Sequence, residues 1–347
     1  MPLTITQDPT GHSPEDAKRW VQILAKYREP NLKRSLFEIA VTIGPLLAIW
    51  ALAWAALSVS WALALGLALL NSLFLVRSFM IQHDCGHGAF FANRTASDWV
   101  GRTLGVLTAT PYDVWRRTHS VHHATAGNLG KRGMGDVDTL TVAEYRARSA
   151  WGRLKYRMYR NPIVLFGLGP SYLFLLQNRL PVGLFHAGAR YWISAMGTNL
   201  SIIVVLLTVA WFGGLAPIVL IYLPTVIGAA SIGVWLFFVQ HQFEETHWDQ
   251  DKDWQLHEAA LLGSSHYELP GVLRWFSANI GVHHVHHLYS RIPYYRLTEV
   301  LRDHRALAES QRMTIRESLR CVRFHLWDET QRRLLSFRAA RELYGAI

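Results

Sequence analysis

The sequence predicts an all-α integral membrane protein, with four transmembrane helices in two hairpins under a cytosolic helical cap that holds a histidine-ligated di-metal site. Two long stretches without charged side chains and three histidine groups at helical spacing predict this class. Of the 347 residues, 17% are charged, whereas soluble chains carry roughly a quarter. This apolar composition excludes a disordered protein, and the two cysteines are too few for a disulfide scaffold.

The first apolar region follows a polar and basic segment, residues 1–35, which lacks the apolar core of a secretory signal peptide. Residues 39–76 contain no charged side chain. One span needs about 20 apolar residues, so this stretch is long enough for two spans and a tight turn. We expect helices near 36–57 and 59–80, which together form the first transmembrane hairpin, 36–80.

The second apolar region is longer, because residues 191–243 carry no charge. We expect helices near 199–213 and 216–239, which form a second transmembrane hairpin, 199–239. A pair of buried core helices is the alternative for each hairpin. The length of the uncharged stretches favours membrane spans.

The remaining sections are expected in the cytosol, as a cap over residues 81–198 and a C-terminal part over 240–347. Residues 161–180 are apolar but interrupted by Gly and Pro, which is more typical of an interfacial or re-entrant segment than of a span. A fifth span is the alternative, but an odd number would place the termini on opposite sides of the membrane. We treat residues 1–347 as one domain.

The distribution of basic residues predicts the orientation. The two hairpin turns contain no Lys or Arg, whereas all other sections do. Because positive charge marks the cytoplasmic side, both termini and the cap are expected there, in a bacterial inner membrane. The net charge of +10 also attracts anionic membrane lipids. No separate basic and aromatic patch indicates nucleic-acid binding.

Histidines form the most informative pattern. Three groups repeat offsets of three and four residues: His83 and His87; His119, His122 and His123; His283, His286 and His287. Residues at these offsets lie on one helix face, so each group presents its imidazoles in one direction, and His241 follows the last expected span. Imidazole suits Fe, Zn and Cu. The number of ligands exceeds what one ion takes and indicates two.

The type of metal chemistry follows from what accompanies the histidines. A zinc hydrolase would use about three protein ligands, and a soluble carboxylate di-iron bundle needs two Glu-x-x-His motifs. Only one such motif occurs, at Glu244 and His247. An all-imidazole site facing a membrane favours iron and O2 activation. A membrane metal transporter or sensor is the alternative of another class, but it would place its ligands at the membrane midplane.

The three histidine boxes, His-x3-His and twice His-x2-His-His, resemble those of the membrane fatty acid desaturase and hydroxylase superfamily. The resemblance covers roughly residues 35–305. It is closest to bacterial acyl-lipid desaturases of the delta-12 (omega-6) type. The segments that carry it are HDCGHGAFF (83–91), TPYDVWRRTHSVHHATAGNLGKRGMGDVDTLTVAEY (110–145), NPIVLFGLGPSYLFLLQNRLP (161–181) and NIGVHHVHHLYSRIPYYRL (279–297).

This resemblance implies an O2-dependent enzyme that introduces a cis double bond into a fatty acyl chain of a membrane lipid. It implies two Fe ions, O2 as co-substrate and an external donor such as ferredoxin. The implied metal ligands are His83, His87, His119, His122, His123, His241, His283, His286 and His287. A hydroxylase or ketolase of the same superfamily, acting on alkyl chains or carotenoids, is the alternative. The residues around the third box favour a desaturase.

Other positions near the boxes are less decisive. His284 lies outside the box pattern and is expected to form hydrogen bonds. Related acyl-CoA desaturases have an Asn four residues before the isolated His, where this chain has Phe237, and Asn279 is a substitute by position only.

Several charged residues near the boxes have two possible roles each. Asp84 either orients an imidazole or faces water, whereas a turn role is slightly favoured for Asp136 and Asp138 over holding box histidines. A place beside the metal ligands is the less favoured reading for Glu244 and Glu245. Arg116 and Arg117 either contact a phosphate of the acyl carrier or lipid, or form a solvated basic face, and the sequence favours neither role.

Overall fold

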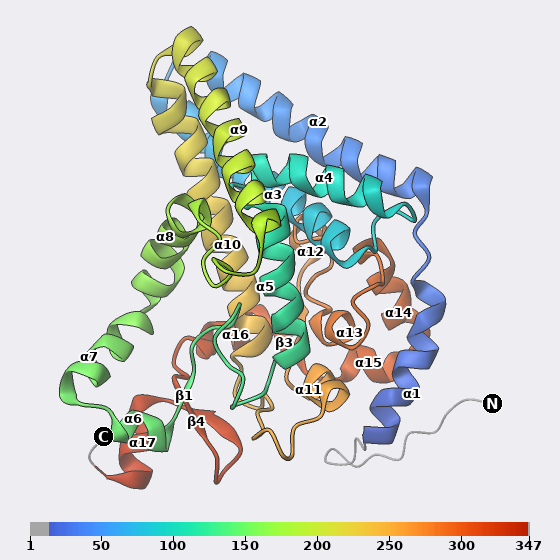
Figure 1. The fold of residues 1–347 in the computed structure, drawn as a ribbon, viewed down its shortest axis with the longest axis vertical. Helices are drawn as coiled ribbons and strands as arrows, with labels where there is room; N and C mark the ends of the chain where they lie inside the picture. The colour runs from blue at the N-terminus through green and yellow to red at the C-terminus, as the bar shows by residue number, and fades with distance from the viewer. Residues whose placement is uncertain (1–13, 346–347) are drawn as a thin grey trace.

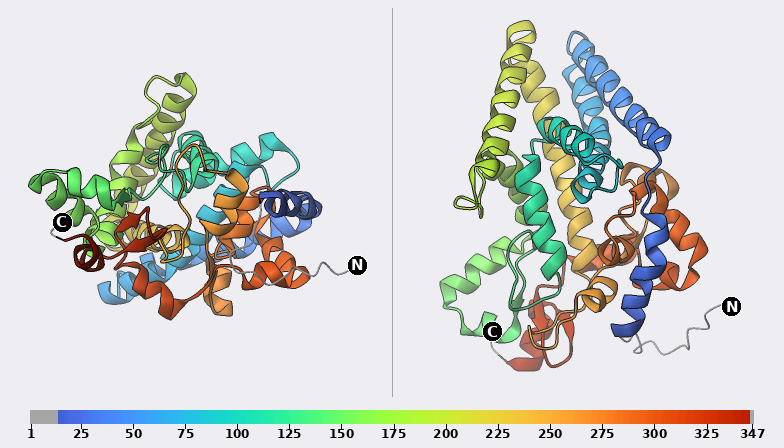
Figure 2. Two further views of the ribbon diagram at one scale, coloured as in Figure 1. Left: turned by 90° about the horizontal axis from the view of Figure 1, so that it is seen from below. Right: turned by 45° about the vertical axis from the view of Figure 1, so that its right-hand side comes forward.

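The computed structural model describes residues 14–345 and is mostly helical. Long apolar helices project at one end of the molecule, and short helices with a few short strands form a cap at the other (Figure 1). Four of the described helices are long and apolar enough to cross a membrane. The right-hand view of Figure 2 shows them as two pairs that diverge away from the cap. The predicted fold class is therefore confirmed.

The first hairpin consists of α2 (Leu32–Ala56) and α3 (Trp61–His87). The side chain of Ser60 accepts a hydrogen bond from the backbone N–H of Leu63 and starts α3, and Gly88, with φ of +67°, ends it. Both helices are longer at the cap end than predicted, since α2 begins four residues before residue 36 and α3 continues seven residues past residue 80. Glu38 and Arg77, which border the uncharged stretch, form a buried ion pair between the two helices, so these charges do not interrupt the helices.

The second hairpin consists of α9 (Ala189–Gly213), followed by one π-helical turn, η4 (Ile218–Tyr222), and α10 (Leu223–His241). The predicted start of α9 at residue 199 is ten residues too late, because the helix begins directly after Gly188, whose φ is +117°. Residues 161–180 contain three short helices: η2 (Val164–Leu168), α8 (Gly169–Leu175) and η3 (Gln177–Arg179). None of them is long enough to be a candidate span.

The cap brings together segments from three parts of the chain. The helices that precede the second hairpin are α4 (Arg94–Leu107), α5 (Tyr112–Thr125), α6 (Val142–Ala147) and α7 (Ala150–Tyr159). Those that follow it are α11 (Leu256–Leu262), α12 (Gly271–Phe276), α13 (His283–Leu288), η5 (Tyr294–Arg296), α14 (Leu297–Asp303), α15 (Arg305–Glu309), α16 (Ile315–Cys321) and α17 (Phe337–Tyr344). The N-terminal α1 (Pro14–Leu24) and η1 (Ala25–Tyr27) lie beside them (Figure 1).

Two small sheets complete the cap and were not expected from the sequence. One has the order β1 (Leu140–Thr141), β4 (Leu326–Asp328), β5 (Arg333–Leu335), and the other pairs β2 (His266–Glu268) with β3 (Arg312–Thr314). In the first, β1 runs parallel to β4 with Leu140 opposite Leu326, and β4 and β5 are antiparallel. In the second, the strands are parallel, with His266 opposite Arg312. Strands of two or three residues are too short for an alternating pattern to reveal them.

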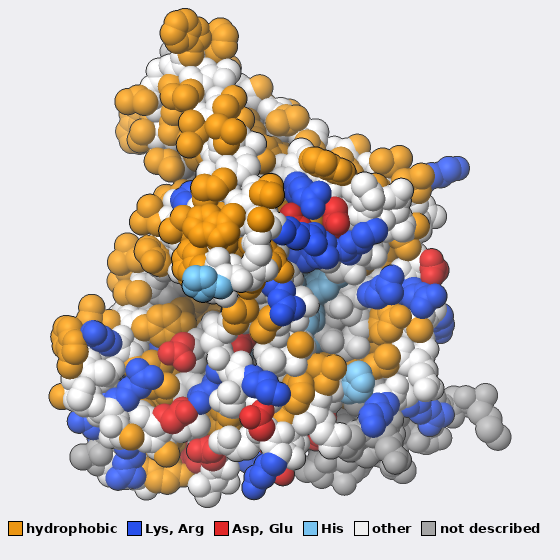
Figure 3. Space-filling model, viewed as in Figure 1, with side chains coloured by type: hydrophobic (Ala, Val, Ile, Leu, Met, Phe, Trp, Pro, Cys, Tyr) orange, Lys and Arg blue, Asp and Glu red, His pale blue; other side chains and the backbone are white. Residues whose placement is uncertain are grey.

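The surface of the projecting helices is apolar, whereas that of the cap is charged, as expected for a protein that is partly embedded in a membrane. Large apolar side chains cover the projecting helices, and at their tips Val59, Trp211 and Phe212 are about four-fifths exposed. Figure 3 shows this apolar column above a cap with mixed charges. Soluble proteins rarely expose apolar patches of this extent. The protein is therefore a membrane protein.

A buried polar network joins the first hairpin to the C-terminal part of the cap. Arg77 forms an ion pair with Glu38, donates from Nε to Thr42 at 3.1 Å, and lies 4.0 Å from the ring centroid of Trp275. The hydroxyl of Tyr294 donates to Glu38 at 3.0 Å. These contacts fix the segment that carries the third histidine box against α3.

Candidate metal centre

Nine histidines converge where α3 and α10 enter the cap. The last turns of these helices carry His83, His87 and His241, and the cap helices α5 and α13 carry the other six. The imidazoles form two groups, and in each group one ligand nitrogen per residue lies within 4.8 Å of all the others. The first group is His83, His87, His119, His123 and His286, and the second is His122, His241, His283 and His287.

The first group joins three helices. The Nε2 atoms of His87 and His119 lie 3.1 Å apart, as do those of His119 and His123. His286 reaches the group from α13, with its Nε2 atom 3.0 Å from that of His123. The ring of His83 packs 4.6 Å from those of both His87 and His286.

The second group is smaller and is centred on His241. The Nε2 atom of His241 lies 3.2 Å from that of His122 and 3.0 Å from that of His283. The two groups adjoin each other, because the rings of His123 and His287 stack with centroids 4.0 Å apart. Each group thus has enough nitrogens for one metal ion.

Each His-x2-His-His box divides between the groups. In the second box, His119 and His123, four residues apart, face the first group, whereas His122 faces the second. In the third box, His283 and His287, also four apart, face the second group and His286 the first. The pair of histidines four residues apart therefore belongs to the first group in the second box and to the second group in the third box. The spacing alone did not predict this difference.

Burial keeps these imidazoles in the form that binds metal. Desolvation lowers the pKa of His119, His123, His283, His286 and His287 well below the ordinary value of 6.5, and the neighbouring imidazoles lower it further. A neutral imidazole offers a lone pair to a metal, whereas a protonated one does not.

The nitrogens also lack other partners that would explain their closeness. The Nε2 atom of His287 is buried and has no hydrogen-bond partner among the described residues. Several Nε2 atoms face one another at about 3 Å. A buried donor or acceptor without a partner is costly, and a cation shared by the facing lone pairs removes that cost. The residues therefore fit bound metal.

Carboxylates and a carbonyl hold the outer nitrogens of three of these rings. Asp136 contacts Nδ1 of His122, Asp84 lies 3.2 Å from Nδ1 of His83, and the carbonyl of Gly263 lies 3.1 Å from Nδ1 of His241. Such partners fix the ring so that Nε2 faces the metal. The preference for a turn role is therefore wrong for Asp136. Asp138 is exposed and, in the described part of the chain, contacts no histidine side chain.

Asp84 also connects the first group to the third box. Its second carboxylate oxygen accepts a hydrogen bond from the backbone N–H of Tyr294 at 2.7 Å. Of its two possible roles, the structure thus supports the orientation of an imidazole.

The structure also settles the extra positions. His284 is buried and its Nε2 atom lies 2.8 Å from the carbonyl of Leu307, outside both groups, as expected. The Asn279 amide donates to the Tyr294 carbonyl at 3.0 Å, a contact within the segment that carries the third box. The ring of Phe237 packs 4.9 Å from His122 and 5.2 Å from His241, which makes this side of the second group apolar.

The two glutamates that follow α10 point away from the metal centre. Glu244 and Glu245 are exposed, and Glu244 lies 3.8 Å from Arg333. His247, the partner of Glu244 in the single Glu-x-x-His motif, pairs with Asp249 at 2.6 Å. Neither motif residue belongs to the groups, so the motif does not bind metal in the manner of a carboxylate bundle.

Comparison with known proteins agrees with this geometry. The family model described as "Fatty acid desaturase" matches residues 58–318. A fatty acid desaturase of Bacillus subtilis is 40% identical over 328 residues, which cover 94% of this chain and 92% of that protein.

Two Synechocystis proteins are more distant relatives. An sn-1 acyl-lipid omega-3 desaturase (ferredoxin) is 29% identical over 78% of this chain and 74% of its own length. An sn-1 oleoyl-lipid 12-desaturase is 27% identical over 78% of this chain and 75% of its own length. The match to the family model covers most of the chain and includes all three histidine boxes. The chain belongs to the fatty acid desaturase family and is a desaturase enzyme.

Proposed function

We propose that this desaturase acts on the fatty acyl chains of membrane lipids and introduces a cis double bond of the delta-12 (omega-6) type, with two iron ions at the nine histidines. The observation that carries the proposal is the pair of imidazole groups at the cap end of the apolar helices. The acyl-lipid 12-desaturase among the relatives supports the regiochemistry.

The overall reaction consumes O2, two electrons and two protons, removes two hydrogens from adjacent CH2 groups, and releases two waters. Iron, when bound, supplies the oxidation of an unactivated CH2 group. The nine histidines would hold the metal as neutral donors. Asp84 and Asp136 would keep the Nδ1 protons of His83 and His122, so that Nε2 stays free for ligation.

The protein must also keep the site apolar and oriented. Phe237 covers the second group, and Trp115 stacks on His119 with ring centroids 4.7 Å apart. Such aromatic walls exclude water, which limits side reactions of a strong oxidant. An alkyl chain offers no polar handle, so its position would be set by the shape of this apolar surround.

The electrons would come from an external donor. The name of one Synechocystis relative includes ferredoxin, and the net charge of +10 suits a small acidic donor. We further propose one catalytic domain in a bacterial inner membrane, with both termini and the metal centre in the cytoplasm. The basic residues support this orientation, since the hairpin turns contain none.

The test is the fatty-acid profile of a bacterium that makes only saturated and monounsaturated chains, with and without this gene and with a co-expressed ferredoxin. We expect a dienoic acid whose new bond lies beyond the existing one. His286→Ala should abolish it, because it removes a nitrogen from the first group. His186→Ala, at an exposed histidine outside both groups, should not.

Two other results would contradict the proposal. A new hydroxy acid would make the protein a hydroxylase of the same superfamily. An unchanged lipid profile despite good membrane expression would contradict an acyl-lipid substrate.

A further inference from the structure

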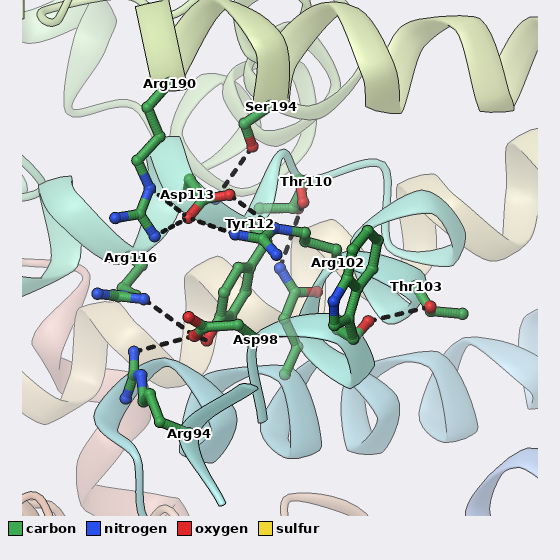
Figure 4. A network of polar contacts seen from close by, with 12 residues as sticks. Arg94, Asp98, Arg102, Thr103, Thr110, Tyr112, Asp113, Arg116, Arg190 and Ser194 are labelled. Atoms are coloured by element: carbon green, nitrogen blue, oxygen red, sulfur yellow. Dashed lines mark hydrogen bonds and ion pairs between the residues drawn. The ribbon is translucent and has the colours of Figure 1, made fainter. Parts of the chain in front are cut away.

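Four arginines surround two aspartates at the junction of α4, α5 and α9 (Figure 4). Asp98 lies 3.1 Å from Arg94 and 2.9 Å from Arg116, and also accepts a hydrogen bond from the hydroxyl of Tyr112. Asp113 accepts hydrogen bonds from Arg102 at 3.0 Å and from Arg190 at 2.9 Å. We call these four arginines and two aspartates the interfacial arginine cluster.

The interfacial arginine cluster carries more positive charge than it needs to join the helices. Each aspartate already has two guanidinium partners, which leaves a surplus of two positive charges. Asp113 is buried and Asp98 is partly buried, whereas the side chains of Arg94 and Arg190 are 42% and 52% exposed. Arg117, next in the chain, is exposed and adds further charge. The outer face of the cluster is therefore positive.

Burial acts to raise the pKa of Asp113, but the hydrogen bonds from Arg102 and Arg190 outweigh it and lower the pKa. This carboxylate therefore stays ionised at neutral pH. It cannot itself receive an anion, so an anion must bind through the outer sides of the guanidinium groups, whose five N–H donors are only partly used.

The cluster lies where the protein leaves the membrane. Arg190 is the second residue of the span α9, and the chain carries no further charge until Glu244. Exposed aromatic side chains flank it, with Trp99 on α4 and Trp192 on α9. Tryptophan is typical of the membrane–water interface. Figure 3 shows the basic side chains gathered directly beside the apolar column.

We propose that the interfacial arginine cluster is a binding site for the phosphate of an anionic phospholipid. Guanidinium groups bind phosphate oxygens through two parallel hydrogen bonds, and the adjacent apolar surface of α9 suits the acyl chains of the same molecule. A surplus of positive charge beside apolar helices matches a lipid better than a free anion, which would gain nothing from that surface.

The site also adjoins the metal centre. Arg116 lies on α5, one helical turn before His119. A phospholipid bound there would have its head group on the helix that carries the second histidine box. If the proposed function holds, such a lipid is suitably placed to be the acyl substrate. The binding claim itself does not depend on turnover.

The test measures lipid binding to the purified full-length protein in a neutral detergent. Phosphatidylglycerol, phosphatidylcholine and inorganic phosphate are titrated separately, and binding is followed by thermal shift and by native mass spectrometry. The variants are Arg190→Gln and Arg116→Gln. Each leaves its aspartate with one arginine, so the fold should persist. The matched control is Arg338→Gln on α17, where Arg338 pairs with Glu342 far from the apolar helices.

We expect phosphatidylglycerol to bind the native protein more tightly than phosphatidylcholine, and added salt to weaken it. Each arginine removed should weaken binding about fivefold, because one basic residue near an anionic lipid contributes about 1 kcal/mol. Arg338→Gln should bind as the native protein does. Equal binding of both lipids, equal stabilisation by inorganic phosphate, or unchanged affinity in both variants would overturn the proposal. None of these readouts needs desaturation, so failure of the site and failure of the proposed function are distinguishable.

Discussion

At the scale of the residue, the main feature is the way in which single contacts decide which imidazole nitrogen faces the centre of its histidine group. Asp136 illustrates it, since its carboxylate contacts Nδ1 of His122 while Nε2 of the same ring lies 3.2 Å from that of His241. A carboxylate on the outer nitrogen raises the basicity of the ligand and fixes its tautomer.

Replacement of Asp136 should weaken metal binding without unfolding the protein. We expect Asp136→Asn to lower metal affinity at the second group about 10-fold or more, because a neutral amide supports the His122 ring less well. The measurement is iron per chain by plasma mass spectrometry across a chelator titration. Asp138→Asn is the matched control, two residues away and exposed. Equal iron retention by the two variants would refute the role of Asp136.

The buried histidines also predict how the metal-free protein responds to pH. Burial lowers the pKa of His119, His123, His283, His286 and His287 below 6.5 in the folded state. Below pH 6.5 the unfolded chain therefore binds more protons than the folded chain, and stability falls as the pH falls.

Each of these histidines can contribute at most about 1.4 kcal/mol per pH unit to that loss. We expect the thermal midpoint of chelator-treated protein to be constant above pH 7 and to fall steadily between pH 6.5 and 5. A midpoint that does not change over this range would show that the imidazoles are not buried and neutral.

The sequence was informative at this scale, but incomplete. Helical offsets predicted which histidines share a face, and all nine lie in the two groups. The offsets did not predict that His286 and His287, adjacent in the chain, face different groups. Nor did they favour Asp136, because its contact spans a loop of irregular structure whose path no local pattern specifies.

At the scale of the element, uncharged length predicted four spans well, but it missed the last seven residues of α3 and the first ten of α9. Charge marks the end of a span only when the charged side chain must reach water. Glu38 and Arg77 instead neutralise each other between α2 and α3, and Arg190 pairs with Asp113 of the cap. Long-range pairs of this kind are invisible in the sequence of one segment.

This pair of charges between α2 and α3 should be costly to break. Arg77→Met leaves Glu38 buried and without its main partner, which destabilises a protein by about 3–5 kcal/mol. The double variant Arg77→Met/Glu38→Leu should recover much of that loss. Unfolding in mixed detergent measures both. Arg34→Gln is the control, since Arg34 also pairs with Glu38 but its side chain is half exposed. A single Arg77 variant as stable as the control would contradict the argument.

At the scale of the whole molecule, the cap and the turns of both hairpins lie at opposite ends (Figure 1). The proposed orientation therefore places the turns outside the cytoplasm, together with Ser58 and Leu215. The native cysteines, Cys85 and Cys321, are buried and should not interfere with labelling.

Labelling of introduced cysteines tests this orientation. On intact spheroplasts, a membrane-impermeant maleimide should modify Ser58→Cys and Leu215→Cys, whereas Lys252→Cys in the cap should react only after lysis. If instead Lys252→Cys reacted on intact spheroplasts and the two turn variants did not, the protein would have the opposite orientation. The sequence alone predicts this orientation, because the positive-inside rule depends only on where the Lys and Arg residues lie.

We propose that the two histidine groups each hold one iron ion, and the iron content of the purified protein is the measurement that distinguishes this arrangement from others. We expect two iron ions per native chain, and one in a His241→Ala/His283→Ala variant, which removes half of the second group and leaves the first complete. One iron or none in the native protein, or loss of both in a variant that stays folded, would contradict it.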